Sequence, residues 1–332
     1  MTRFLNSLTH ARRWPVALLW ICFSCLAVAA APKKQHLSFE MTLSTEPDEL
    51  FFRTTDNWQV GVGGLNGTAI IAGQPVDVKL VASLEYENGS GPFAGSVTFY
   101  WSLTDILAMR YTGTTERNIV GDTSIYGRLE AVGGSGRFAQ AKARGTVYGF
   151  RSGVLGGAVD YQIEIDLGPG GGPGAGDLSI DDKGPKEKGA HPLKSQLNIS
   201  VGLVGDPGDQ FVRNIGANPT LTIGYVRLLG ATVVGGEPVQ VELAGAIEYR
   251  DGEGPFNVYL HFDFADGSRL ICRRTGRAER RKDGSTILRG DVVVLYGTGA
   301  FAGARGEGTA VSSRTGPPGS PVQTDISLRL SK

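Results

Sequence analysis

Cysteine is scarce in this chain of 332 residues, and the scarcity limits its covalent chemistry. Of three cysteines, Cys22 and Cys25 lie in an N-terminal segment that we expect to be removed, which leaves Cys272 alone. A single cysteine cannot form an internal disulfide. The mature fold must therefore be stabilised by its core.

Histidine is also rare, and the sequence shows no pattern of metal ligands. His36, His191 and His261 are the histidines beyond the N-terminal segment, and their spacing matches no known zinc motif. No serine lies in a nucleophile-elbow context. We expect no metal site and no cofactor, and the catalytic residues of an enzyme of this sequence would be unknown.

Basic residues are not in excess, which bears on the partners. The chain has 33 basic and 33 acidic residues, and the first thirty-one residues contain three arginines and no acid, so 30 and 33 remain. Nucleic acids and anionic membranes bind proteins with a basic surface. The sequence therefore predicts no nucleic-acid partner.

Residues 1–31 have the layout of a secretory signal peptide. Arg12 and Arg13 precede an apolar run over residues 14–28, and small residues follow before Pro32. The run is shorter than the roughly 20 residues of a transmembrane helix. We expect cleavage, a secreted or periplasmic location and no integral membrane span after processing; an uncleaved anchor is the alternative.

The remaining chain contains one pattern twice, 163 residues apart. Gly91-Pro92-Phe93 returns as Gly254-Pro255-Phe256, and the positions between and beyond these landmarks keep the same offset. A constant offset indicates two copies of one domain. Glycine and proline between the copies cannot pack a core. The predicted segments are a signal peptide (1–31), a first β-barrel repeat (32–167), a Gly/Pro-rich linker (168–195) and a second β-barrel repeat (196–332).

Apolar and polar residues alternate along most of each copy. In residues 158–167, Val159, Tyr161 and Ile163 share one face while Asp160 and Gln162 share the other. This period of two is typical of half-buried strands. Short strands joined by Gly, Asn and Asp turns indicate an antiparallel sandwich or barrel, and we favour the barrel because closure removes the free edges.

A glycine-rich segment lies late in each copy, at residues 133–145 and 296–308. Its Gly-x-Gly-x-x-Ala pattern does not predict a nucleotide site, because no helix follows it. Together with the Gly-Pro-Phe landmarks, the segment resembles bacterial secreted members of the allene oxide cyclase and dirigent barrel superfamily. The resemblance implies an all-β fold of two tandem eight-stranded antiparallel β-barrels, each with an internal pocket, and no particular reaction.

The alternation also predicts the side chains that point into each barrel. These positions are apolar and aromatic, with tyrosine hydroxyls and one arginine as their polar groups. Such a lining suits an apolar ligand held by a few hydrogen bonds, and core packing is the alternative. Arginine in the second copy where the first has tyrosine directs attention to the second barrel. The candidate ligand-binding residues are Tyr86, Tyr111, Tyr249, Arg274, Phe99 and Phe262.

Two charged residues recur on the predicted outer wall. Glu85 and Arg110 match Glu248 and Arg273, and we interpret each pair as an exposed ion pair of about 0–1 kcal/mol; a pair that orients substrate is the alternative. His261 is likewise expected to be exposed.

Two further features have alternatives. We interpret Cys272 as a core thiol because the first copy has Met109 there, and a nucleophile activated by adjacent arginines is the alternative. Gly127 and Gly290 interrupt inward-facing rows, which indicates a bend in the barrel or space for a ligand.

Three functions follow from these patterns. The first is an exported double β-barrel protein that binds a hydrophobic small molecule in a barrel cavity. The second, implied by the resemblance, is a cofactor-free cyclase, isomerase or dirigent-like enzyme that shapes a reactive apolar substrate. The third is a structural envelope or adhesion repeat with filled barrels. The expected partner is a hydrophobic small molecule, and a homo-oligomer is allowed.

Overall fold

The computed structural model describes residues 35–55, 57–168, 195–216 and 220–331. The predicted signal peptide and nearly all of the predicted linker lie outside the described residues. The described residues all belong to one compact unit. Among the described residues, none belongs to a helix that could cross a membrane.

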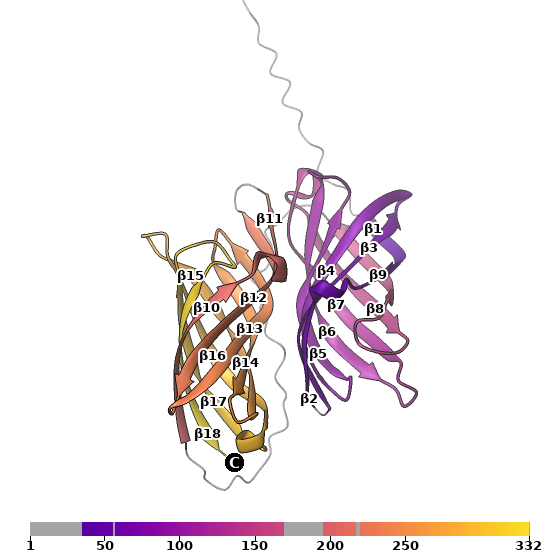
Figure 1. Cartoon of the computed structure of the whole chain (residues 1–332). Coiled ribbons are helices and arrows are strands. Elements are labelled where there is room, and N and C mark those ends of the chain that lie inside the picture. The colour runs from indigo at the N-terminus through magenta and orange to yellow at the C-terminus, as the bar shows by residue number, and fades with distance from the viewer. Residues whose placement is uncertain (1–34, 56, 169–194, 217–219, 332) are drawn as a thin grey trace, which may run out of the picture. The chain divides into compact units, whose positions relative to one another are not determined.

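The first copy folds into a nine-stranded antiparallel sheet that curls on itself (Figure 1). Its strands are arranged in the order β1-β9-β8-β7-β6-β5-β4-β3-β2. The sheet meets itself at one isolated bridge, between Ser44, just after β1, and Asn66 in β3. The strands are β1 (Gln35–Leu43), β2 (Leu50–Thr55), β3 (Trp58–Ile71), β4 (Gln74–Glu87), β5 (Gly91–Tyr100), β6 (Ile106–Arg117), β7 (Thr123–Ser135), β8 (Lys142–Arg151) and β9 (Val159–Gly168).

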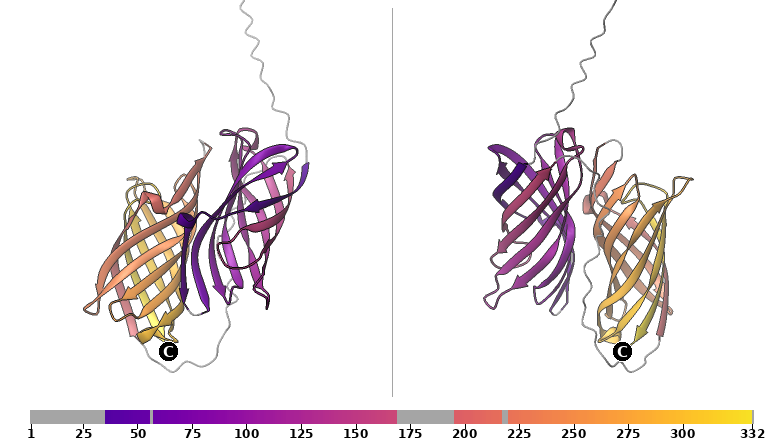
Figure 2. Two further views of the ribbon diagram at one scale, coloured as in Figure 1. Left: turned by 45° about the vertical axis from the view of Figure 1, so that its right-hand side comes forward. Right: turned by 180° about the vertical axis from the view of Figure 1, so that it is seen from behind.

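The second copy repeats this strand order and closes. β10 pairs with β12 through Val204–Leu229 and Gly205–Leu228, so eight strands form a barrel and β11 lies outside it on β12 (Figure 2). The strands are β10 (Ser195–Gly205), β11 (Phe211–Ile215), β12 (Leu221–Val234), β13 (Glu237–Arg250), β14 (Gly254–Phe264), β15 (Arg269–Arg280), β16 (Thr286–Thr298), β17 (Arg305–Arg314) and β18 (Val322–Ser331).

The prediction of an all-β fold is confirmed, but two closed barrels are not. The second copy is a closed eight-stranded barrel, whereas the first is a curled sheet that meets itself at the isolated Ser44–Asn66 bridge. The helical turns of the described chain are short 3₁₀ segments: η1 (Pro47–Glu49), η2 (Gly136–Phe138), η3 (Pro207–Asp209) and η4 (Gly299–Phe301).

Each copy has its own apolar core on the inner face of its sheet. Phe99, Leu107 and Met109 are fully buried in the first core, and Phe262 and Cys272 are fully buried in the second. The alternation expected from sequence therefore places the inner rows correctly. On β4 and β13, however, every residue is buried over 78–86 and 241–249, so the outer face of these segments is covered as well.

Candidate functional site

The predicted ligand-binding residues lie on inner faces, as expected, but in two separate interiors. Tyr86, Tyr111 and Phe99 are buried in the first copy, and Tyr249, Arg274 and Phe262 are buried in the second. Phe99 and Phe262 occupy equivalent positions in the two cores. The structure therefore does not bring the six residues together into one site.

The interior of the first copy contains a small cavity with a polar end. Tyr86, Tyr111, Tyr161 and Arg151 line this end, and the cavity has a volume of about 50 Å³. Burial raises the pKa of Tyr86 to about 12. Arg151 was missed by the sequence analysis, although the aligned Arg314 shows that arginine recurs there.

This cavity is too small for the function first expected. Ligand pockets for small organic molecules have volumes of roughly 300–1,000 Å³, whereas this one has about 50 Å³. Binding of a hydrophobic small molecule in this interior is therefore wrong, and a cyclase that shapes an apolar substrate there fails for the same reason. Filled interiors alone do not identify an envelope or adhesion role.

Arg274 lies in the second interior, where it binds the barrel itself. Its Nη1 donates to Ser312 Oγ at 2.8 Å, and its Nη2 donates to the carbonyl oxygens of Leu288 at 2.9 Å and Ala310 at 3.2 Å. The guanidinium also lies 5.1 Å from the ring centroid of Phe256. Burial lowers the pKa of Arg274 to about 10, with Tyr249 opposing the shift. Most of its donors are therefore used within the barrel wall.

The ion pairs predicted on the outer walls exist, but with exchanged partners. Arg110 Nη2 donates to Glu248 Oε1 at 2.6 Å, and Arg273 Nη1 donates to Glu85 Oε2 at 2.8 Å. All four residues are buried. The expectation of exposed pairs within each barrel is therefore wrong, because the outer faces of the two sheets cover each other at these strands.

His261 is also buried rather than exposed. It lies beside Glu242 in the register of β13 and β14. Burial lowers the pKa of His261 to about 4; nearby Glu242 opposes this shift, while Arg53 and Arg227 add to it. No cluster of three or more metal-ligating side chains occurs in the described part of the chain.

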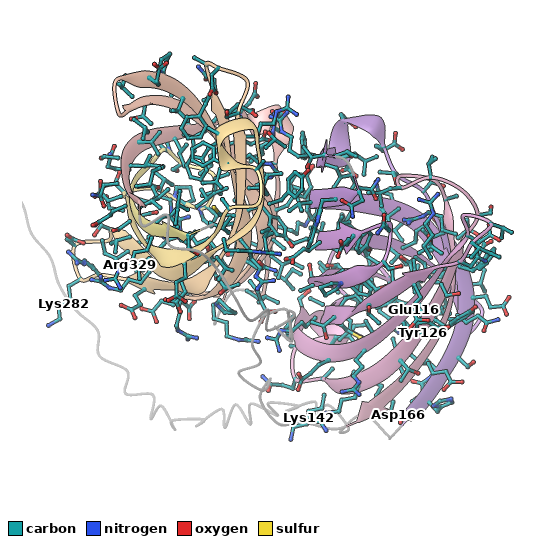
Figure 3. All side chains as sticks on the ribbon, turned by 90° about the horizontal axis from the view of Figure 1, so that it is seen from below. Glu116, Tyr126, Lys142, Asp166, Lys282 and Arg329 are labelled. Carbon is teal, nitrogen blue, oxygen red and sulfur yellow. The ribbon has the colours of Figure 1, made fainter. Side chains whose placement is uncertain are left out.

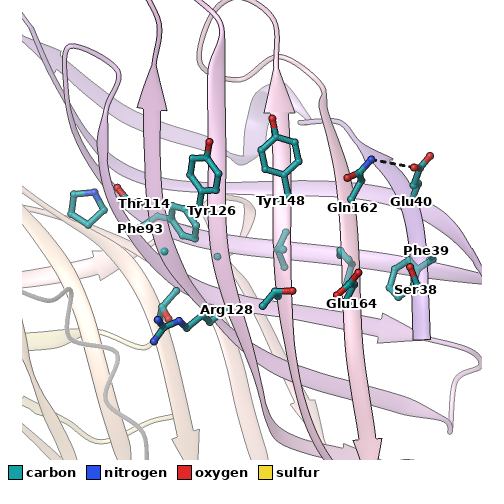
Figure 4. Close-up of a pocket in the computed structure, with 17 residues that line it drawn as sticks. Ser38, Phe39, Glu40, Phe93, Thr114, Tyr126, Arg128, Tyr148, Gln162 and Glu164 are labelled. Atoms are coloured by element: carbon teal, nitrogen blue, oxygen red, sulfur yellow. Dashed lines mark hydrogen bonds between the residues drawn. The ribbon is translucent and has the colours of Figure 1, made fainter. Parts of the chain in front are cut away.

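A large groove lies on the outer face of the first sheet. It has a volume of about 1510 Å³ and crosses β5, β6, β7, β8, β9 and β1 (Figure 4). The groove is open to solvent, and Tyr126 projects from the outside of the sheet there (Figure 3). Its outward side chains form two rows perpendicular to the strands.

The first row contains two exposed aromatic side chains. Tyr126 and Tyr148 face each other across β7 and β8, with ring centroids 5.5 Å apart and exposed fractions of 45% and 41%. Next to them, Gln162 Nε2 donates to Glu40 Oε1 at 3.2 Å. In the order of the strands from β5 to β1, this aromatic row consists of Pro92, Thr114, Tyr126, Tyr148, Gln162 and Glu40.

The second row is polar and runs parallel to the aromatic row. Arg128 pairs with Thr146, and Thr146 pairs with Glu164, in the register of β7, β8 and β9. Between the rows, Gly113 and Gly127 stand opposite each other at inward-facing positions of β6 and β7. In strand order from β6 to β1, this polar row consists of Thr112, Arg128, Thr146, Glu164 and Ser38.

The second copy has the same strands but a different outer face. Arg289 and Val311 stand where the first copy has Tyr126 and Tyr148, and they too are cross-strand neighbours. The sequence analysis missed the groove because it compared inward positions. The available signal was an aromatic residue at the outward, otherwise polar positions of two neighbouring strands.

Comparison with known proteins does not assign this chain to a family. No family model matches it, and no curated protein matches it. Matching solved structures include a BenF-like porin from Pseudomonas fluorescens Pf-5, with 12% identity, 90% of this chain and 98% of that chain covered, and a TM-score of 0.19. Wzi, an outer membrane protein of Escherichia coli, has 9% identity, coverages of 89% and 83%, and a TM-score of 0.17. TM-scores this low establish neither a common fold nor a function.

The expected membership of the allene oxide cyclase and dirigent superfamily is therefore wrong. No family model supports it, and the first copy does not form the closed eight-stranded barrel that this membership implies. The glycine-rich landmark has a local explanation: a Cβ on Gly134 would lie 2.5 Å from the Phe138 carbonyl oxygen, and Gly136 has a φ of +56°. Such a tight turn requires glycine whatever the ancestry of the chain.

Proposed function

We propose that this protein binds an extended carbohydrate along the outer groove of its first sheet. The observation that supports this proposal is the aromatic row, in which Tyr126 and Tyr148 are adjacent, exposed and aligned across the strands. Exposed aromatic side chains on a rigid sheet are informative because folding alone does not require them.

The chemistry of the two rows suits sugars. The apolar C–H face of a pyranose ring packs on a tyrosine ring, while hydroxyl groups require carboxylate, amide and hydroxyl partners at the sides. Glu40 and Gln162 offer such groups at one end of the aromatic row, and Thr146 and Glu164 offer them in the polar row. The Gln162–Glu40 hydrogen bond holds two of these groups in place before a ligand arrives.

The dimensions favour a chain of sugars over a single sugar. The aromatic row crosses six neighbouring strands. At roughly 4.8 Å between strands, it extends about 24 Å. A groove of this length, open along one side, accommodates several sugar units of an extended oligosaccharide.

Charge argues against nucleic acid, which also stacks on aromatic rows. Glu40 and Glu164 carry negative charge in the groove, and Arg128 is the basic residue among its lining side chains. Proteins that bind single strands need a positively charged track for the phosphates. A neutral glycan has no phosphates and needs no positively charged track.

The location is part of the same proposal. Export by the predicted signal peptide, residues 1–31, would place the groove in the cell envelope or outside the cell, where polysaccharides are abundant. The proposed role is recognition of a glycan in that setting.

Binding to a panel of soluble polysaccharides tests the proposal, with affinity electrophoresis for screening and calorimetry for affinity. The panel contains a neutral β-glucan, a xylan, a mannan, chitin oligosaccharides and soluble peptidoglycan fragments. We expect at least one to bind, and Tyr126→Ala or Tyr148→Ala to weaken it by about 1–2 kcal/mol, or roughly 5- to 30-fold. Both substitutions are at exposed positions, so the fold should remain intact.

The second copy supplies the matched control. Arg289→Ala and Val311→Ala change the same register positions on the other sheet and should leave the affinity unchanged. Equal affinity of wild type and the Tyr126→Ala/Tyr148→Ala double variant would contradict the proposal. Failure of every glycan, with capture of a peptide or protein by the same face, would assign the groove to a different partner.

A further inference from the structure

The exchanged ion pairs are related by an approximate two-fold symmetry. Glu85 and Glu248 are equivalent positions in the two copies, and so are Arg110 and Arg273. Each copy gives its arginine to the glutamate of the other. When residue i contacts j and the equivalent of j contacts the equivalent of i, the contact is isologous, which is the pattern of two-fold dimers.

A contact between equivalent residues marks the symmetry axis. Ser83 and Ala246 are equivalent, and the Ala246 backbone N–H donates to Ser83 Oγ at 2.8 Å. Around this point lies one apolar cluster made of further equivalent positions. It contains Val62 with Tyr225 and Val81 with Ala244. Phe51 and Phe211 pack against it and are equivalent by register, because they pair with Val62 and Tyr225 on the neighbouring strands.

Two more apolar clusters flank the axis and are symmetry mates. One packs Leu221 and Ile223 of the second copy with Ala108 and Val132 of the first. The other packs the equivalents with the copies reversed: Trp58 and Val60 of the first copy with Ile271 and Leu295 of the second. The shared face therefore resembles a dimer interface throughout.

The two copies have diverged at specific points of this face. Val62 is small where its equivalent, Tyr225, is large, and the two share one cluster. Lys79 is equivalent to Glu242, which accepts a hydrogen bond from Arg53 Nε at 2.9 Å. In a dimer of two first copies, Lys79 would replace Glu242 as the neighbour of Arg53, and the two positive charges would repel. In a dimer of two second copies, two Tyr225 side chains would meet near the axis, where one tyrosine now packs with Val62.

We propose that the two halves, residues 35–168 and 195–331, form a dimer-type complex that does not need the segment joining them. Each half recognises the opposite half of this chain and discriminates against its own kind. The repeated ion pairs and apolar clusters supply the affinity. The differences at Val62/Tyr225 and Lys79/Glu242 supply the specificity, since wrong pairs suffer repulsion or poor packing.

Cutting the folded full-length protein tests the proposal. A protease site inserted within residues 169–194 is cleaved after folding, and the sample is analysed by size exclusion and native mass spectrometry. We expect the halves to remain together at micromolar concentration. After mixing with isotope-labelled nicked protein, every pair should contain one first half and one second half, whether or not exchange has occurred.

Substitutions in the shared face measure its contribution. In nicked protein, Arg110→Ala or Glu248→Ala should each raise the dissociation constant at least about thirty-fold. Arg110→Ala removes the partner of the buried Glu248 carboxylate, and Glu248→Ala leaves the buried Arg110 with only the longer contact to Glu130, at 3.5 Å. The double variant should lose less than the product of the two factors. Glu248→Gln is the milder alternative if a single variant does not fold, and Arg329→Ala, at an exposed position of the second half, is the control expected to change nothing.

Two results would overturn the proposal. Separation of the wild-type halves on cleavage would show that the joining segment is required. Pairs of two first halves or two second halves, at the frequency of random association, would show that the face has no preference. Neither result bears on glycan binding, which depends on the exposed residues Tyr126 and Tyr148 of the first sheet.

Discussion

Acidification should destabilise the protein through His261. This side chain is buried between the two sheets beside Glu242, and burial lowers its pKa from 6.5 to about 4. In the unfolded chain the same imidazole takes up a proton near pH 6.5. Between these values the unfolded state binds more protons than the folded state.

The direction and size of the effect follow from linkage. A depressed folded-state pKa contributes stability that is present above the unfolded pKa and is lost as pH falls. For His261 the window runs from pH 6.5 down to about 4. With one pKa unit equal to about 1.4 kcal/mol, the loss between pH 7 and pH 5 is about 2 kcal/mol.

Other groups act in overlapping ranges, so the test must be a difference. Burial raises the pKa of Glu248 despite the opposing effect of Arg110, and this contributes stability that is present at low pH and lost as pH rises. The pKa of Glu242 is lowered by its arginine partners, against the effect of burial, so its contribution is lost below the range of interest. Subtracting the profile of a His261→Gln variant removes both.

Urea unfolding at pH 7, 6 and 5 provides the measurement. Tryptophan fluorescence and circular dichroism should give coincident transitions if unfolding is two-state. Wild type should lose about 2 kcal/mol more than His261→Gln between pH 7 and pH 5. Parallel profiles for wild type and His261→Gln would refute the assignment.

Two further predictions concern Gly127 and Cys272, which lie at inward-facing positions. Gly127→Ala should cost about 1–3 kcal/mol in urea unfolding, because a Cβ there would lie 2.5 Å from Tyr111 Cε2, whereas Gly168→Ala, with nothing within 4 Å, should have little effect. Cys272 is fully buried, and burial raises its thiol pKa, so a thiol reagent at pH 8 should label protein lacking residues 1–31 only after unfolding. Rapid labelling of the folded protein would contradict this and would show that the Cys272 thiol is accessible and reactive.

Local alternation was sufficient to predict the inner rows of both sheets. Tyr86, Phe99, Tyr249 and Phe262 lie on inner faces because side-chain direction in a strand depends only on the parity of the position. Closure was not predictable in the same way. In the first copy the end of β1 forms one residue pair with β3, and in the second copy β10 forms two residue pairs with β12. No short sequence pattern encodes this difference.

The prediction of a ligand cavity inside a barrel was wrong because composition does not show whether inward side chains leave space between them. Aromatic residues at inner positions either surround a cavity or fill it, and their volumes and rotamers decide between these outcomes. Here Tyr111 and Phe93 pack with centroids 4.5 Å apart over the place that Gly127 leaves open. The glycine was therefore a sign of close packing rather than of space for a ligand.

Alternation predicts which residues point outward, but it does not predict whether another part of the protein covers them. Val81, Ser83 and Glu85 stand at outward positions of β4, and all are buried against the second copy. Small and apolar residues at outward positions were the signal for that contact. Tyr126 and Tyr148 were the corresponding signal for an exposed face.

Duplication explains why the two outer faces differ in their freedom to change. In a two-fold homodimer every substitution appears in both subunits. A residue substituted at the axis therefore contacts the same substituted residue of the other subunit, and any groove is present on both subunits. Joining two copies in one chain removes this constraint. The axis can then hold Val62 opposite Tyr225, and the exposed face can keep tyrosines in one copy while Arg289 and Val311 replace them in the other. The comparison of copies therefore points to function at exposed differences, and the exposed tyrosine pair belongs to the first copy rather than to the second.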